Sequence, residues 1–279
     1  MRITKKMMVT VIVALILVVT ALMYQFTGSQ DKSTKDAKII SSEKIEEAVK
    51  TTESNTPTIF IHGYKGTLRT FETMVKEFEL KDEDKSMVTI TVEPNGKLVY
   101  SEEALKQVND PLVQLYFKNG TASVDDQLTW MKAAMKVIAD IYDTKSINIV
   151  AHSMGGLVGT KYIMETYNDK NYPKAEKFVT LASPIKGWVK YVITNPAEED
   201  LHPNSAALAG LYSDRNEFPK DVEVFSAYGL QDTLVSVDSA KGLKEFTANI
   251  ITSGYMDNHS YIHEDIEVID SAYSFLEFN

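Results

Sequence analysis

The sequence predicts an α/β protein with a mostly parallel central sheet and helices on both of its faces. Three observations lead to this prediction. Apolar strand-like runs alternate with helical patterns over residues 55–279, as expected for parallel strands joined by helices. Residues 147–150 form an apolar run that leads through a tight turn into a helix rich in small residues. The length of about 225 residues suits one domain of this class.

The strand-like runs follow one another in a regular order along this domain. They are residues 58–61, 112–117, 147–150, 178–182, 222–228 and 246–251. Residues 87–100 lie between the first two runs and contain Pro-Asn-Gly-Lys at 94–97, a strong hairpin signal between two β-rich arms. We expect these arms to form an antiparallel addition to the sheet.

The clearest predicted helix precedes the run at 147–150. Ser123 and Asp126 form a capping pattern at its start. Apolar side chains then recur at helical spacing, at Leu128, Met131, Met135, Ile138 and Tyr142. This stripe predicts a helix that packs one face on the sheet.

The N-terminus predicts a membrane anchor. Arg2, Lys5 and Lys6 precede residues 7–26, which carry no charge and are long enough to cross a bilayer core of about 30 Å. Positive charge on the leading side places the rest of the chain outside the cytoplasm. We therefore expect a single-pass transmembrane signal-anchor over residues 1–27. A cleaved signal peptide, and hence a secreted protein, is the alternative, although no small-x-small cleavage pattern follows.

Residues 28–54 are rich in Ser, Thr, Lys and Glu and predict a disordered stalk before a domain at 55–279. The chain has no cysteine, which excludes disulfides and cysteine-linked lipids within it. The formal net charge is −10, and the first 30 residues contribute only positive charge. So acidic a domain argues against nucleic acid as a partner. The sequence does not indicate an oligomeric state.

Ser153 is the candidate nucleophile, at the apex of the turn in NIVAHSMGGLVG. A nucleophile elbow needs small residues two before and two after the serine, because the backbone turns sharply there. These positions hold Ala151 and Gly155, where the usual pattern has two glycines. The extra methyl group is a departure that we expect the turn to accept.

A serine hydroxyl needs a base, and the base needs a group that orients it. Asp232 follows a predicted strand directly and is the preferred acid, with Asp238 as the alternative further into the next helix. His259 lies between the last strand and the last helix and is the preferred base. His263 is the rival, although we expect it to cap the final helix beside solvated carboxylates.

The run IFIHGYKGT supplies a strand and a glycine-containing turn upstream of the elbow. In such a position the turn contributes half of an oxyanion hole, so we expect the backbone N–H groups of Tyr64 and Met154 to be its donors. His152 is expected to point away from Ser153 and to pack within the elbow.

Residues 184–220 form a candidate cap insertion between two predicted strands, with Trp188 and Tyr212 among its aromatic residues. It either shapes the substrate pocket or simply packs on the body of the domain. Its weak amphipathicity argues against a lipid-surface lid. No metal-binding or phosphate-loop pattern occurs in the sequence, so we predict no metal and no cofactor.

These motifs together resemble the α/β-hydrolase superfamily. Within it, IFIHGYKGT, NIVAHSMGGLVG, VTLASPIKG, GLQDTLVSVDSA and NHSYIHED resemble the lipase-like, surface-exposed hydrolases of Gram-positive bacteria, over residues 57–278. The resemblance implies the α/β-hydrolase fold and a serine hydrolase of carboxylic esters, with Ser153, Asp232 and His259 as the triad.

The expected function is therefore that of a membrane-anchored extracellular esterase or lipase-like enzyme. Its partners would be a small-molecule ester, or a lipid- or wall-associated one, together with the membrane through the N-terminal helix. Two alternatives stay open: an acyltransferase with the same triad, and a non-catalytic surface binding protein on a hydrolase scaffold.

Overall fold

A computed structural model describes residues 56–108, 110–189 and 192–277. Its described part contains an eight-stranded sheet in the order β3-β2-β4-β1-β5-β6-β7-β8. The strands are β1 (Thr58–Ile61), β2 (Lys85–Val92), β3 (Leu98–Val99), β4 (Asp110–Phe117), β5 (Ser146–His152), β6 (Lys174–Leu181), β7 (Glu223–Gly229) and β8 (Ile250–Tyr255). Within this sheet only β3 runs antiparallel to its neighbour. The predicted α/β class with a mostly parallel sheet is confirmed.

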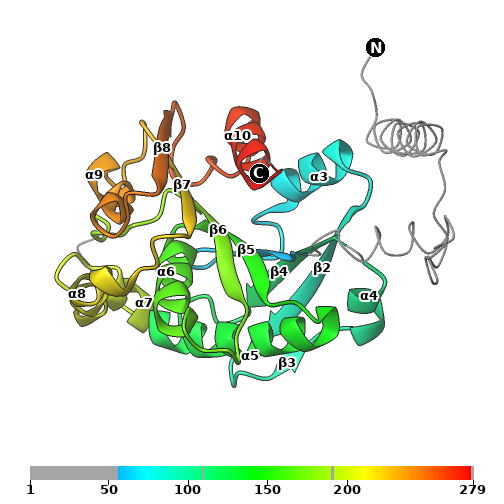
Figure 1. Cartoon of the computed structure of the whole chain (residues 1–279). Coiled ribbons are helices and arrows are strands. Elements are labelled where there is room, and N and C mark those ends of the chain that lie inside the picture. Colours follow the sequence, from blue (N-terminus) through cyan, green and yellow to red (C-terminus); the bar gives the residue numbers. More distant parts are fainter. Residues whose placement is uncertain (1–55, 109, 190–191, 278–279) are drawn as a thin grey trace, which may run out of the picture. The chain divides into compact units, whose positions relative to one another are not determined.

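Helices cover both faces of the sheet, and each face has its own apolar core (Figure 1). The helices are α3 (Glu72–Lys81), α4 (Glu102–Lys106), α5 (Val124–Tyr142), α6 (Met154–Thr166), α7 (Pro196–Asp200), α8 (Ala206–Ser213), α9 (Val237–Ala240) and α10 (Ile266–Glu277), with 3₁₀ turns η1 (Arg215–Glu217) and η2 (Gly242–Glu245). The core on one face includes side chains of α5 and α6. The core on the other includes side chains of α3 and α10.

Helix α5 forms as its sequence predicts. The Ser123 hydroxyl accepts the backbone N–H of Asp126 at 3.0 Å and donates to its carboxylate at 2.8 Å, which satisfies amides that have no partner inside the helix. Met131, Met135 and Ile138 are fully buried on the side that meets the sheet. The helix ends at Tyr142, and the next residue, Asp143, has left-handed backbone geometry.

Two strand predictions need correction. The turn at 94–97 forms, with Gly96 at φ 81°, but β2 pairs with β4 in parallel along its whole length and belongs to the main sheet. Only β3 is the antiparallel addition. The run predicted at 246–251 becomes a strand only from Ile250. Phe246 instead packs its ring on Tyr212 and Phe218 of the cap segment, so its hydrophobicity serves the core rather than the sheet.

The predicted transmembrane helix at 1–27 and stalk at 28–54 lie outside the described residues. Among the described helices, none combines the length and apolar character needed to cross a bilayer.

Candidate active site

Ser153 lies at the carboxyl end of β5, directly before α6 begins at Met154. Its backbone has φ 52° and ψ −125°, a conformation that L-residues rarely adopt and that surrounding structure must enforce. The Ser153 N–H donates to the carbonyl of Leu181 at 2.9 Å, which ties the turn to β6. The residue is 3 % exposed. This geometry is that of a nucleophile elbow.

Two glycines make room for the elbow. A Cβ on Gly155 would lie 2.4 Å from the carbonyl oxygen of Ile61. A Cβ on Gly63 would lie 2.7 Å from the Cβ of Ser153. Ala151, the departure from the usual pattern, is fully buried within β5 and pairs with Ile61 and Thr180 in the neighbouring strands. The close approach of backbone to backbone therefore falls on the glycines and not on position 151.

The structure brings Ser153, His259 and Asp232 into one chain of hydrogen bonds. His259 Nε2 lies 2.9 Å from Ser153 Oγ, and His259 Nδ1 lies 2.8 Å from Asp232 Oδ2. The other carboxylate oxygen accepts the N–H groups of Leu234 and Val235, both at 2.8 Å. Because a carboxylate accepts at Nδ1, that nitrogen carries the proton and Nε2 is left to accept the serine proton.

The three side chains come from loops that follow different strands, β5, β7 and β8. The carboxyl ends of parallel strands share one edge of a sheet, so residues far apart in sequence meet there. Asp238, the alternative acid, lies elsewhere: it is in α9 and forms an ion pair with Lys186 at 3.1 Å.

His263 does not cap the final helix. Asp265 does so, because its carboxylate accepts the N–H groups of Glu267 at 2.7 Å and Val268 at 3.1 Å. His263 is buried instead, with its ring 4.8 Å from that of His152. Burial, and secondarily the charge of His259, lower the pKa of His263 to about 4. The prediction that His263 is solvated is therefore wrong.

His152 contributes more than packing, which sequence reasoning missed. Its Nε2–H donates to the backbone carbonyl of His259 at 2.9 Å, and its ring lies 5.1 Å from the His259 ring. Burial and the adjacent histidines hold the pKa of His152 well below its ordinary value. A neutral His152 therefore supports the loop that carries the candidate base.

The two predicted oxyanion donors belong to two segments beside Ser153, the start of α6 and the loop after β1. Met154 begins α6, and first-turn amides have no acceptor within their helix. Tyr64 follows Gly63, which packs on Ser153. His62 holds this loop: its Nε2 accepts the Phe117 N–H at 3.0 Å, so its Nδ1–H donates to the Gly63 carbonyl at 2.8 Å. Desolvation lowers the pKa of His62, which favours this neutral form.

The segment 184–220 contains α7, α8 and η1, and it both packs on the body and reaches the site. Leu201, Leu208 and Leu211 are buried in the same core as α5 and α6. The Trp188 ring meets the Tyr64 ring edge-on, with centroids 5.4 Å apart. Glu198 bonds to the Tyr64 hydroxyl at 2.6 Å. No sequence motif indicates this last contact.

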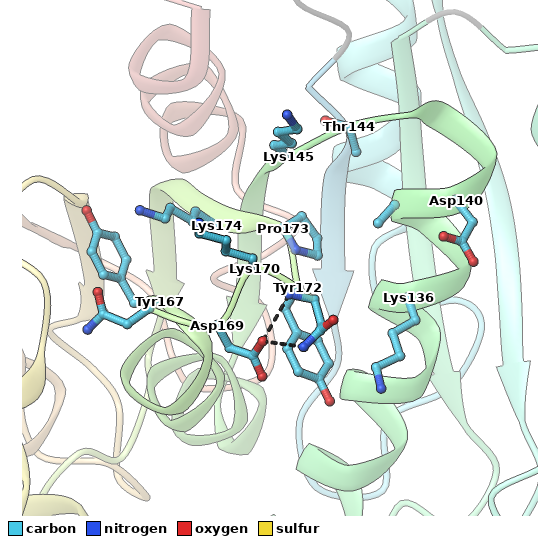
Figure 2. A pocket seen from close by; sticks show the side chains of 13 residues that line it. Lys136, Asp140, Thr144, Lys145, Tyr167, Asp169, Lys170, Tyr172, Pro173 and Lys174 are labelled. Carbon is cyan, nitrogen blue, oxygen red and sulfur yellow. Dashed lines mark hydrogen bonds between the residues drawn. The ribbon is translucent and has the colours of Figure 1, made fainter.

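A pocket of about 950 Å³ lies away from these residues (Figure 2). It is lined by the last turns of α5, the loop before β5, the loop after α6 and the first residue of β6, including Lys136, Lys145, Tyr167 and Lys174. Those are the amino ends of the strands, the edge opposite the one that carries Ser153. Ser153, Asp232 and His259 are not among its lining residues. Hydrogen-bond geometry, rather than pocket size, therefore identifies the candidate site.

Comparison with known proteins identifies one family. The family described as "Alpha/beta hydrolase of unknown function (DUF915)" matches residues 46–279. Comparison with curated proteins finds no match.

Solved structures share the fold. A gene product of Listeria innocua superimposes with a TM-score of 0.69 at 23 % identity, covering 80 % of this chain and 95 % of that one. A candidate cell-surface hydrolase of Lactobacillus plantarum gives 0.63 at 19 %, covering 79 % and 89 %. Est1E of Butyrivibrio proteoclasticus, also solved with ferulic acid bound, gives 0.53 at 17 %, covering 80 % and 88 %.

Proposed function

Because the chain belongs to this family of alpha/beta hydrolases of unknown function, we propose that it is a serine hydrolase that cleaves carboxylic esters through an acyl-enzyme. The hydrogen-bond chain from Ser153 through His259 to Asp232 is the observation that carries the proposal. The similarity of the fold to that of Est1E is consistent with it.

In this mechanism Ser153 Oγ attacks the acyl carbonyl while its proton passes to His259 Nε2. Asp232 keeps the imidazole oriented and stabilises its positive charge. The N–H groups of Met154 and Tyr64 bind the oxyanion of the tetrahedral intermediate. His259 then protonates the departing alcohol. In the second half, water attacks the acyl-enzyme while His259 takes its proton, and the acid leaves as His259 returns a proton to Ser153 Oγ.

We also propose that the enzyme is anchored in the cell membrane with its hydrolase domain outside. The support is the uncharged run at 7–26 behind Arg2, Lys5 and Lys6. The substrate would then be an ester met at the cell surface, either a soluble small molecule or one attached to lipid or cell wall.

The test is covalent labelling of the full-length chain with a fluorophosphonate probe, followed by mass spectrometry of the adduct. We expect label on Ser153, none in Ser153→Ala, and hydrolysis of p-nitrophenyl butyrate that Ser153→Ala abolishes. His259→Ala should fall to the Ser153→Ala level, whereas His263→Ala should keep measurable turnover. A folded wild-type chain that takes no label would contradict the proposal and favour a binding role.

A further inference from the structure

Glu198 is a buried carboxylate that is hydrogen-bonded to the loop of the candidate oxyanion hole. It lies in α7 and is 1 % exposed. Its Oε1 accepts the hydroxyl of Tyr64 at 2.6 Å, a residue 134 positions earlier in the chain. Its Oε2 accepts both the N–H and the hydroxyl of Thr194, each at 2.7 Å. Burial of a carboxylate is costly unless it is hydrogen-bonded in this way.

The direction of these bonds is determined by Asn195. Its side-chain amide donates to the Tyr64 hydroxyl at 3.1 Å and to the Thr194 hydroxyl at 3.2 Å. Each hydroxyl has one proton, and with the amide as its donor it can direct that proton only toward Glu198. The Tyr64 hydroxyl, the Thr194 hydroxyl and the Thr194 N–H therefore all donate to Glu198. Hydrogen bonds to an ionised carboxylate are charge-assisted and stronger than neutral ones.

Helix α7 is itself hydrogen-bonded to the body of the domain, so the position of Glu198 is fixed. The Asp200 carboxylate accepts the N–H of Val124 at the start of α5, at 2.7 Å. The Ala197 N–H donates to the Thr121 carbonyl at 3.3 Å. Tyr64 is thus held on two sides. Its side chain is bound to α7, while the preceding Gly63 packs on Ser153.

We propose that Glu198 is a positioning residue: through the Tyr64 hydroxyl it holds the Tyr64 backbone N–H where the oxyanion forms. The inference rests on the proposed function, and it assigns Glu198 no contact with substrate. The Glu198–Tyr64 hydrogen bond would couple the position of the cap segment to that of the oxyanion hole. Because the donor acts on charge that develops only in the transition state, displacing it lowers turnover more than substrate binding.

The experiment uses Tyr64→Phe and Glu198→Gln in the full-length chain, with p-nitrophenyl butyrate as substrate. Both variants should still label at Ser153 at long times and should lose about tenfold in kcat with KM changed by less than about twofold. The inhibitor 1,1,1-trifluoropentan-2-one forms an oxyanion on the serine, so its Ki should rise by the same factor as kcat/KM falls. The double variant should lose no more than either single variant.

The matched control is Tyr167→Phe, which removes another tyrosine–carboxylate bond, to Asp221, at the opposite edge of the sheet. It should change neither kcat nor Ki. Unchanged kcat and Ki in Tyr64→Phe, or a rise in KM alone, would overturn the positioning role. If Glu198→Gln fails to fold, Tyr64→Phe decides by itself. A wild-type chain without label at Ser153 contradicts the proposed function, and the positioning role falls with it.

Discussion

At the scale of single residues, the site depends on neutral histidines packed behind the candidate base. His152 lies between His259 and His263, with ring centroids 5.1 and 4.8 Å away. A second positive charge beside His259 would oppose the imidazolium that the mechanism needs. The low pKa values of His152 and His263 avoid that charge near neutral pH.

The buried His263 makes stability depend on pH. Its pKa falls from 6.5 to about 4 on folding, mainly through desolvation. The unfolded chain therefore binds the proton first as pH falls, so stability present above pH 6.5 is lost between pH 6.5 and about 4. Urea unfolding should show His263→Gln free of this loss. The free energy of unfolding of the wild type should fall, relative to the variant, by about 2 kcal/mol between pH 7 and pH 5.

His202→Gln is the control for this measurement. It removes a histidine between α7 and α8 and leaves the ring contacts of His152 with His259 and His263 intact. It should leave the pH dependence of the wild type unchanged. Identical pH dependence in the wild type and His263→Gln would show that His263 is not held neutral by the fold.

At the scale of elements, the strand-turn-helix of β5 and α6 is shaped by close backbone contacts. Gly155, in the first turn of α6, lies against the Ile61 carbonyl of the neighbouring strand β1. The strand order puts β1 beside β5, so the loop after β1 and the elbow after β5 are adjacent. The same packing that forms the core therefore sets the distance between Ser153 and the Gly63–Tyr64 turn.

Two glycine variants separate this close contact from ordinary helix propensity. Gly155→Ala should lower the free energy of unfolding by about 1–3 kcal/mol and reduce labelling of Ser153, because the added Cβ would lie 2.4 Å from a backbone oxygen. Gly210→Ala, in the exposed part of α8, meets no atom within 4 Å and should raise it by about 0.5–1 kcal/mol with labelling unchanged. Equal stability and labelling in both variants would argue against a steric limit at the elbow.

At the scale of the whole molecule, the two edges of the sheet have separate features. The candidate site lies at the carboxyl ends of the strands. The described chain begins at the other edge, where the Pro57 carbonyl accepts the Asn148 N–H at 2.9 Å just before β1. Pro57, the residue before β1, thus lies at the edge of the sheet opposite the site.

The proposed anchor has a direct test. Full-length protein should remain in the membrane fraction after an alkaline carbonate wash, and a chain starting at residue 31 should be soluble with equal labelling of Ser153. N-terminal sequencing of the full-length product distinguishes a retained anchor from a cleaved signal peptide. Release of an uncleaved full-length chain by the wash would contradict the anchor.

Local patterns along the chain were sufficient to predict the sheet class, the capped helix α5 and the elbow at Ser153. Each depends on side-chain periodicity or on turn residues within a few positions, which a sequence displays directly. The strand predicted at 246–251 began too early for the same reason. A local pattern shows that Phe246 is apolar, but not whether it lies in a strand or packs in the core outside the sheet.

What the sequence determined by itself is the α/β class, the order of Ser153, Asp232 and His259, and the family to which they point. Only the tertiary structure decided that His259 faces Ser153 while His263 is buried behind His152, and that Glu198 meets Tyr64. The contacts of His259 with Ser153 and of Glu198 with Tyr64 join segments more than a hundred residues apart. The choice of base is between two histidines only four residues apart. Chain packing sets both; the sequence favoured His259 over His263 only through its position along the chain, and it gave no sign of the contact between Glu198 and Tyr64.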